Sequence, residues 1–268
     1  MPMTMGRLLI INPNTSATVS ALLQRHVQGE VSPALKVHTV TARFGAPYIA
    51  SEASYAVAQH AVLDAWAAAV ERGERPDAVL IGCFGDPGLF ALRETCGLPV
   101  GGLAQAAFSA AAAHGRFAVV TGGERWGPML ERLALALGHA HSLAGIHTVA
   151  QSGAELAADP AGAHALLADA CLEAVARFGA DAVILGGAGL AGLAAAIAPG
   201  LPVPLIDSVS AGARWAMGAG RAAPRPSAAC IDVAWQGVSW ELEALAARAS
   251  TPLTRSSAPC HHAADEHT

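Results

Sequence analysis

The sequence predicts an α/β fold made of two half-domains that resemble each other. Short apolar runs alternate with longer amphipathic stretches, which is typical of parallel strands buried on both faces and covered by helices. Several of these runs recur about 104 residues later in the same order. We therefore expect two Rossmann-like half-domains related by an approximate twofold axis, each with a parallel sheet of about four strands flanked by helices.

Four pairs of segments carry this internal repeat. Residues 77–89 (DAVLIGCFGDPGL) are echoed by residues 181–193 (DAVILGGAGLAGL). Three shorter runs recur in the same way: RLLII (7–11) as RFAVV (116–120), VHTV (37–40) as IHTV (146–149), and LPV (98–100) as LPV (201–203). Because the four matches keep one order and nearly one spacing, we interpret them as strands of a duplicated unit.

Helices are expected between these strands. The amphipathic stretches span residues 16–28, 52–71 and 87–95 in the first half, and 126–137, 161–178 and 190–197 in the second. A closing helix is expected at 207–217, and a further strand and helix at 230–247. We assign residues 1–112 and 208–250 to the first half-domain, 113–207 to the second, and 251–268 to a flexible tail.

Composition excludes several classes of protein. The chain is 53% hydrophobic and 14% charged, which supports a large core, and its net charge of -5 without a basic run argues against nucleic acid as a partner. Glycines and prolines interrupt the long apolar stretch at 179–206, so no membrane partner is expected. The first ten residues lack a secretory signal, which favours a cytoplasmic protein. The five cysteines are odd in number and widely spaced, which predicts free thiols.

No cofactor or metal is expected. The single lysine, Lys36, precedes a strand instead of following one, so a pyridoxal phosphate site is improbable. GGAGLAGL lacks the G-x-G-x-x-G order of a dinucleotide loop. His139 and His141 have no third ligand at a suitable spacing, and the terminal CHH and DEH groups lie in the expected tail.

The chemistry is expected where strands run into helices. In open parallel sheets, ligands bind beyond the carboxyl ends of the strands. Four such junctions are rich in glycine and small polar residues, namely 12–16 (NPNTS), 83–86 (CFGD), 121–124 (TGGE) and 186–189 (GGAG). If the two halves face each other, all four junctions meet in one cleft that suits an anionic group such as a carboxylate.

Cys83 is the candidate reactive group of this cleft. Asp86 and Pro87 are expected as the N-cap and first residue of the next helix, which places the thiol near a helix N-terminus. The partial positive charge there would stabilise a thiolate, and Asp86 would oppose that effect. The alternative is that Cys83 is simply a small buried apolar residue, and spacing alone leaves both interpretations open.

Four motifs of the chain resemble those of the hydantoin racemases, within the aspartate/glutamate racemase superfamily. They are IINPNTS (10–16), GCFGDPGL (82–89), RFAVVT (116–121) and LGGAGLAGL (185–193). The resemblance covers about residues 7–217. It implies a cofactor-independent isomerase with two cysteines, one on each side of the substrate carbon. Cys83 matches the first cysteine. The position of the second is Gly187, to which the internal repeat also leads from Cys83.

The resemblance implies a racemase acting at the carbon alpha to a carbonyl, on 5-substituted hydantoins or a related amino-acid derivative. Cys83 would be the acid/base, and the small-molecule substrate would present a carboxylate or ring carbonyl. Asn14 and Thr15, which also suit helix capping, would hold polar substrate atoms, with Thr121 facing them. Backbone amides would bind the carboxylate or ring carbonyl at Phe84, Gly85, Ala188 and Gly189. A homo-oligomer is implied as well.

The glycine at position 187 leaves several interpretations open. In the first interpretation, the chain is a racemase whose second acid is weakened or replaced, for example by a held water. In the second, it is a single-cysteine enzyme similar to the arylmalonate decarboxylases or the maleate isomerases. In the third, it is not an enzyme but a small-molecule binding protein without turnover. These interpretations differ in whether a second proton donor stands opposite Cys83.

Overall fold

The computed structural model describes residues 6–219 and 234–250. Its first half contains a parallel sheet ordered β2-β1-β3-β4, built from β1 (Arg7–Asn12), β2 (Lys36–Thr41), β3 (Ala78–Ile81) and β4 (Val100–Gly102). The connecting helices are α1 (Ala17–Glu30), α2 (Glu52–Glu71), α3 (Leu89–Cys96) and α4 (Leu103–Ala112). The central strands β1 and β3 are almost completely buried, as their continuous apolar runs predict.

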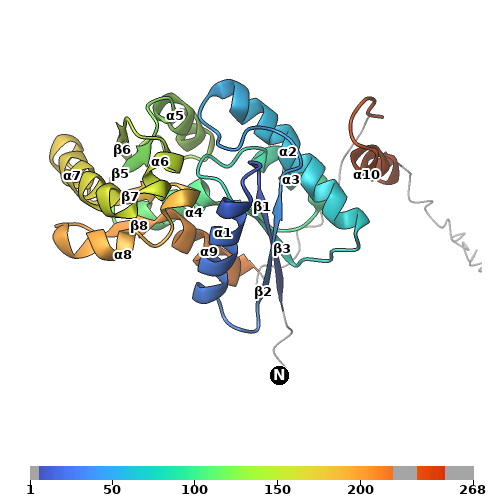
Figure 1. The fold of residues 1–268 in the computed structure, drawn as a ribbon, viewed down its shortest axis with the longest axis horizontal. Coiled ribbons are helices and arrows are strands. Elements are labelled where there is room, and N and C mark those ends of the chain that lie inside the picture. Colours follow the sequence, from blue (N-terminus) through green and yellow to red (C-terminus); the bar gives the residue numbers. More distant parts are fainter. Residues whose placement is uncertain (1–5, 220–233, 251–268) are drawn as a thin grey trace, which may run out of the picture.

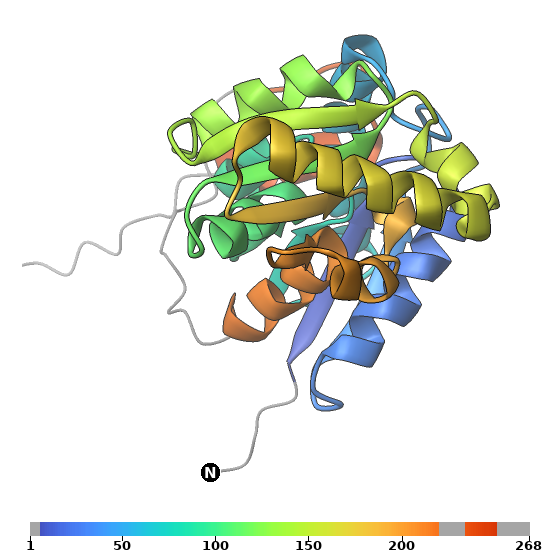
Figure 2. The ribbon, with the colours of Figure 1, turned by 90° about the vertical axis from the view of Figure 1, so that its left-hand side faces the viewer.

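The second half repeats this order with a parallel sheet ordered β6-β5-β7-β8. Its strands are β5 (Phe117–Gly122), β6 (Leu143–Val149), β7 (Ala182–Gly186) and β8 (Leu205–Asp207). Its helical segments are α5 (Trp126–Ala136), α6 (Gly153–Ala158), α7 (Pro160–Phe178), α8 (Ala194–Ile197) and the short turns η1 (Ala188–Leu190) and η2 (Ala198–Gly200). Figure 2 shows α7 lying across this sheet, where it contacts β5, β6 and β7. The expected fold class is confirmed.

Two helices lie between the sheets and join the halves into one core. α4 and α9 (Ser208–Ala219) pack against each other in the middle of the molecule (Figure 1). α4 contacts β4 of the first sheet and β7 of the second, and α9 contacts β3 and β8. Phe84, Phe108 and Phe117 pack together at this junction. The last described helix, α10 (Trp240–Ser250), packs on α2 through Arg43, which binds Asp64 and Glu241.

Several expected elements differ in the structure. The LPV segments at 98–100 and 201–203 were expected as strands. Only Val100 of the first segment belongs to a strand, β4, and the whole second segment precedes β8, which begins at Leu205. The helix expected at 190–197 is broken because Gly192 adopts a φ of 86°. α4 was missed because it is mostly alanine and its only polar residues are Gln105 and Ser109, so it shows little amphipathic pattern, which fits its position between the sheets. The strand expected from Cys230 begins outside the described residues. None of the described helices is long and apolar enough to cross a membrane.

The loop that carries Cys83 is held by the buried carboxylate of Asp86. This carboxylate accepts hydrogen bonds from the backbone N–H groups of Ala104 (2.9 Å) and Gln105 (2.7 Å) in the first turn of α4. Burial raises the pKa of Asp86 to about 7, and these N–H donors act in the opposite direction. Gly102 leaves room for the contact, since a Cβ at position 102 would collide with the carboxylate.

The expectation that Asp86 and Pro87 begin the following helix is wrong. α3 starts at Leu89, after Gly88 at a φ of 77°. Asp86 has a φ of 50°, which turns its side chain away from α3 and toward α4. It therefore supplies α4 with the cap that Gly102, at the N-cap position, has no side chain to provide.

Replacing Asp86 by alanine is expected to lower the free energy of unfolding by about 1–3 kcal/mol, because the backbone N–H groups of Ala104 and Gln105 lose their acceptor inside the fold. Urea denaturation should be measured on the acid side of the raised Asp86 pKa, where ionisation of the buried carboxyl costs no stability. Asp77→Ala is the matched control, because the Asp77 carboxylate accepts the backbone N–H of Arg7 at an exposed site, 2.7 Å away. Equal losses in both variants would contradict the role of Asp86.

Candidate active site

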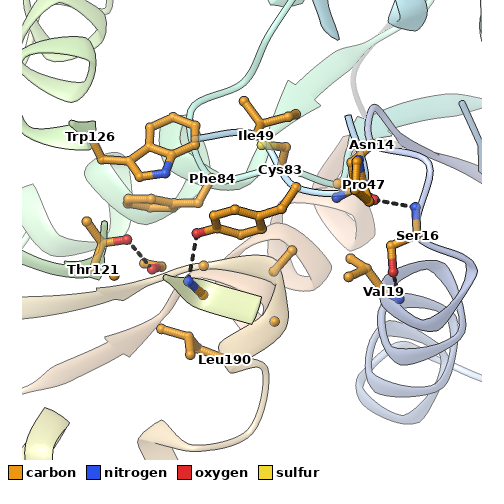
Figure 3. A pocket seen from close by; sticks show the side chains of 18 of the residues that line it. Asn14, Ser16, Val19, Pro47, Ile49, Cys83, Phe84, Thr121, Trp126 and Leu190 are labelled. Atoms are coloured by element: carbon orange, nitrogen blue, oxygen red, sulfur yellow. Dashed lines mark hydrogen bonds between the residues drawn. The ribbon is translucent and has the colours of Figure 1, made fainter. Parts of the chain in front are cut away.

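A pocket of about 280 Å³ opens at the carboxyl ends of the central strands of both sheets (Figure 3). Residues from all four predicted junctions line it, and the cleft expected from the sequence is present. Its polar or backbone lining includes Asn14, Ser16, Gly82, Cys83, Thr121, Gly122, Gly153 and the run Gly186, Gly187, Ala188 and Gly189. Its larger apolar side chains are Val19, Pro47, Ile49, Phe84, Trp126 and Leu190.

Two of the residues predicted for the site do not line this pocket. The backbone N–H of Thr15 donates to the carbonyl of Ala46 at 3.1 Å. Gly85 packs against the ring of Trp126, and its carbonyl accepts the hydroxyl hydrogen of Tyr55 at 2.8 Å. Both positions therefore shape the loops around the pocket without facing it.

Asn14 and Thr121 line the pocket but already have protein partners. The side-chain oxygen of Asn14 accepts hydrogen bonds from Asn12 Nδ2 and from the backbone N–H of Ser16, both at 2.9 Å. The Thr121 hydroxyl donates to the Gly186 carbonyl at 2.7 Å. These bonds join β1 to α1 and β5 to β7, so both side chains set the shape of the strand ends in the structure.

Cys83 follows β3 and is 7% exposed, at a wall of the pocket shared with Ile49 (Figure 3). The expectation that a helix N-terminus would stabilise its thiolate is not met. Burial raises the pKa of the Cys83 thiol, and the negative charge of Asp86 raises it further. Because Asp86 caps α4 and α3 starts only at Leu89, the N-terminus of α3 does not offset these effects.

Gly187 follows β7 at the position equivalent to Cys83. Its φ is 151°, which disfavours any residue with a side chain. A Cβ at this position would lie 3.1 Å from Cδ1 and Cγ of Leu190. The backbone N–H of Gly187 donates to the Ser208 hydroxyl at 3.2 Å. At the end of its central strand, the second half therefore offers no side chain to the pocket, whereas the first half offers the Cys83 thiol at the equivalent position.

Backbone N–H groups face the pocket from both halves. In the part of the chain that the structure describes, no protein group accepts from the N–H of Phe84, Ala188 or Gly189. Gly85 differs, since its N–H is directed to the Asp86 carboxylate. Unpaired N–H groups in a partly enclosed pocket bind carbonyl or enolate oxygens well.

Sequence reasoning missed the residues that close the pocket. Pro47, Tyr48 and Ile49 lie between β2 and α2, and Trp126 opens α5. The segment after β2 also follows the carboxyl end of a parallel strand, so the rule that identified the four junctions applies to it as well. No charged side chain lines the pocket among the described residues. Nor do the described residues contain a group of three metal-ligating side chains.

Known proteins share this arrangement. The model of the Asp/Glu/Hydantoin racemase family matches residues 8–216. The hydantoin racemase of Paenarthrobacter aurescens is 33% identical over 212 residues, which are 78% of this chain and 88% of that protein. The crystal structure of an allantoin racemase from Pseudomonas fluorescens has a TM-score of 0.75 at 28% identity, over 80% of this chain and 91% of that one.

A crystal structure of an arylmalonate decarboxylase shares the fold, with a TM-score of 0.57 at 21% identity over 82% of this chain and 96% of that one. At this identity the similarity shows the fold alone. The family model covers both sheets and all four junctions of the pocket. The chain therefore belongs to the Asp/Glu/hydantoin racemase family of isomerases.

Proposed function

We propose that this enzyme racemises 5-substituted hydantoins or closely related cyclic amides, with Cys83 as an acid/base at the carbon alpha to the ring carbonyl. The observation that carries the proposal is the position of the Cys83 thiol. It lies in a small pocket whose other half is made of glycine backbone with free N–H groups. The proposal needs no cofactor, because the proton acceptor and the oxygen-binding donors come from the chain.

The lining of the pocket favours a neutral substrate with an apolar substituent. Val19, Ile49, Trp126 and Leu190 offer apolar surface, and no cationic side chain among the described lining residues is available to neutralise a carboxylate. Burying a free carboxylate here would be costly, whereas a cyclic amide carries its polar groups without net charge. The carboxylate alternative is therefore less well supported than the ring carbonyl.

The proton at the stereocentre would pass to the Cys83 thiolate. The electrons of the broken C–H bond then move into the adjacent carbonyl, giving a planar enolate. The N–H groups of Phe84, Ala188 and Gly189 are available to this oxygen as its charge grows. A high thiol pKa makes the thiolate scarce but strongly basic, which suits removal of a weakly acidic proton.

A pure enantiomer of 5-benzylhydantoin in heavy water tests the proposal. Loss of optical rotation together with α-deuterium incorporation supports racemisation. Exchange without loss of rotation shows one working base. Carbon dioxide release from a disubstituted malonate, with no reaction of the hydantoin, would replace the proposal by a decarboxylase. Tight hydantoin binding without exchange would replace it by a binding protein.

Replacing Cys83 by alanine is expected to lower α-deuterium exchange by about 10²–10⁴-fold, because the thiolate removes the proton. Cys96→Ala is the matched control, since the half-buried Cys96 thiol is not part of the pocket lining. NMR measurement of both variants at one pH makes the comparison. Retained exchange in Cys83→Ala would rule out the thiol as the base.

The exchange rate is expected to keep rising with pH beyond about 8.5, where an ordinary thiol would be half ionised. Burial and Asp86 raise the pKa of Cys83, and the pocket also holds the buried hydroxyl of Tyr48. Asp86→Asn removes the negative charge and should shift the profile to lower pH. A wild-type profile that is already flat at that pH would contradict the raised pKa.

Gly187→Cys and Gly187→Ala test the second position as a matched pair. Both variants place a Cβ at a φ of 151° next to Leu190, at a shared cost of about 1–3 kcal/mol in stability. Only the cysteine brings a thiol. Racemisation is expected to be at least about 10-fold faster in the cysteine variant than in the alanine variant. Equal rates would show that position 187 lies outside the proton path.

A further inference from the structure

The Tyr48 hydroxyl in the pocket retains a hydrogen to donate. Tyr48 lines the pocket from the segment between β2 and α2. Its oxygen accepts the backbone N–H of Gly153 at 2.8 Å. Because that N–H is a donor, the bond uses a lone pair of the phenol oxygen and leaves its own hydrogen uncommitted. Among the described residues, none accepts this hydrogen.

The other hydroxyl groups of the pocket are poorer proton donors. Thr121 already donates its hydrogen to the Gly186 carbonyl at 2.7 Å. The Ser16 oxygen caps α1 by accepting the N–H of Val19. Ser16 and Thr18, which also lines the pocket, carry aliphatic hydroxyls, which are much weaker acids than a phenol. Cys83 and Tyr48 are the two titratable side chains among the described residues that line the pocket.

Tyr48 belongs to the first half in sequence, but its hydroxyl reaches the second half. Gly153, its hydrogen-bond partner, begins α6. α6 packs against η1, the turn that directly follows Gly187. The phenol oxygen is therefore attached to the side of the pocket that lacks a thiol, whereas Cys83 stands at the end of β3 in the other half.

We propose that Tyr48 is the second proton-transfer residue of this site and replaces the side chain that Gly187 lacks. The inference rests on the proposed racemisation at Cys83. In one direction the C–H bond breaks and its proton passes to the Cys83 thiolate. The enolate then takes the proton of the Tyr48 O–H on the other face, which forms the new C–H bond and leaves a phenolate. In the reverse direction the phenolate removes the proton and the Cys83 thiol donates one.

The surroundings of Tyr48 suit both of its protonation states. Burial raises the pKa of Tyr48 and keeps the phenol protonated as a donor. Hydrogen bonds from the Gly153 N–H and the Trp126 side chain lower the pKa and so stabilise the phenolate once it forms. Negative charge on Cys83 raises the pKa of Tyr48 again, so the two groups favour sharing a single negative charge. One shared charge is what a two-base proton exchange requires.

Tyr48→Phe separates the two proton transfers. The chain contains two tyrosines, and Tyr55→Phe is the matched control because Tyr55 donates to Gly85 and does not line the pocket. With an enantiopure 5-benzylhydantoin in heavy water, inversion should fall about 10²–10⁴-fold in Tyr48→Phe. Exchange with retention at Cys83 should fall far less. In Tyr55→Phe the two rates should change together.

A second variant leaves every hydrogen-bonding atom of Tyr48 in place. Full replacement of tyrosine by 3-fluorotyrosine in the Tyr55→Phe background modifies Tyr48 alone, because these are the two tyrosines of the chain. The fluorine makes the phenol more acidic. The pH profile of inversion should move to lower pH relative to the unfluorinated Tyr55→Phe enzyme, while the profile of exchange with retention stays in place.

The outcomes separate this inference from the proposed function. The role of Tyr48 is overturned if Tyr48→Phe lowers the rate of inversion no more than the rate of exchange. It is also overturned if the pH profile of inversion does not shift in the fluorinated enzyme. Either result leaves Cys83 as the base. A wild-type enzyme that exchanges without inverting also overturns it. A wild-type enzyme that neither exchanges nor inverts the hydantoin overturns the proposed function and, with it, the role of Tyr48.

Discussion

The geometry of the pocket depends on one buried carboxylate. Asp86 ties the loop after β3 to the first turn of α4, and α4 packs between the two sheets. A single contact therefore sets both the position of Cys83 and the docking of one half on the other. The same negative charge makes the thiolate harder to form. The position of the loop and the acidity of the thiol are thus coupled, because the carboxylate that holds the loop also raises the pKa of Cys83.

The two halves have the same topology but contribute differently to the site. The first half supplies the thiol and the segment after β2, with its aromatic and aliphatic side chains. The second half contributes backbone at the end of β7, where Gly186 leaves space for the Phe84 ring that crosses from the first half. Apolar side chains and unpaired backbone N–H groups come from both halves, a lining that suits a ligand with apolar and polar parts.

Much of the fold follows from patterns that are local or repeated. The internal repeat identified both sheets, because strands buried on two faces keep their apolar character in each copy. The role of Asp86 escaped prediction since its hydrogen-bond partner is 18 residues away, in a helix that was itself missed. Four strand-end junctions located the pocket, but Tyr48 and Trp126 were overlooked because neither belongs to a glycine-rich motif. Tertiary packing decides which loop folds over a cleft, and a short sequence motif does not predict that packing.

The contact between position 187 and Leu190 also constrains how this enzyme can evolve. A single substitution that introduces a side chain at Gly187 meets both an unfavourable φ and the Leu190 side chain at 3.1 Å. A smaller residue at position 190 would relieve that contact, but by itself it leaves a cavity in the hydrophobic cluster of the second half to which Leu190 belongs. Substitutions at positions 187 and 190 are therefore coupled, since each alone lowers stability and the second relieves the cost of the first. This coupling helps to keep the two halves unequal.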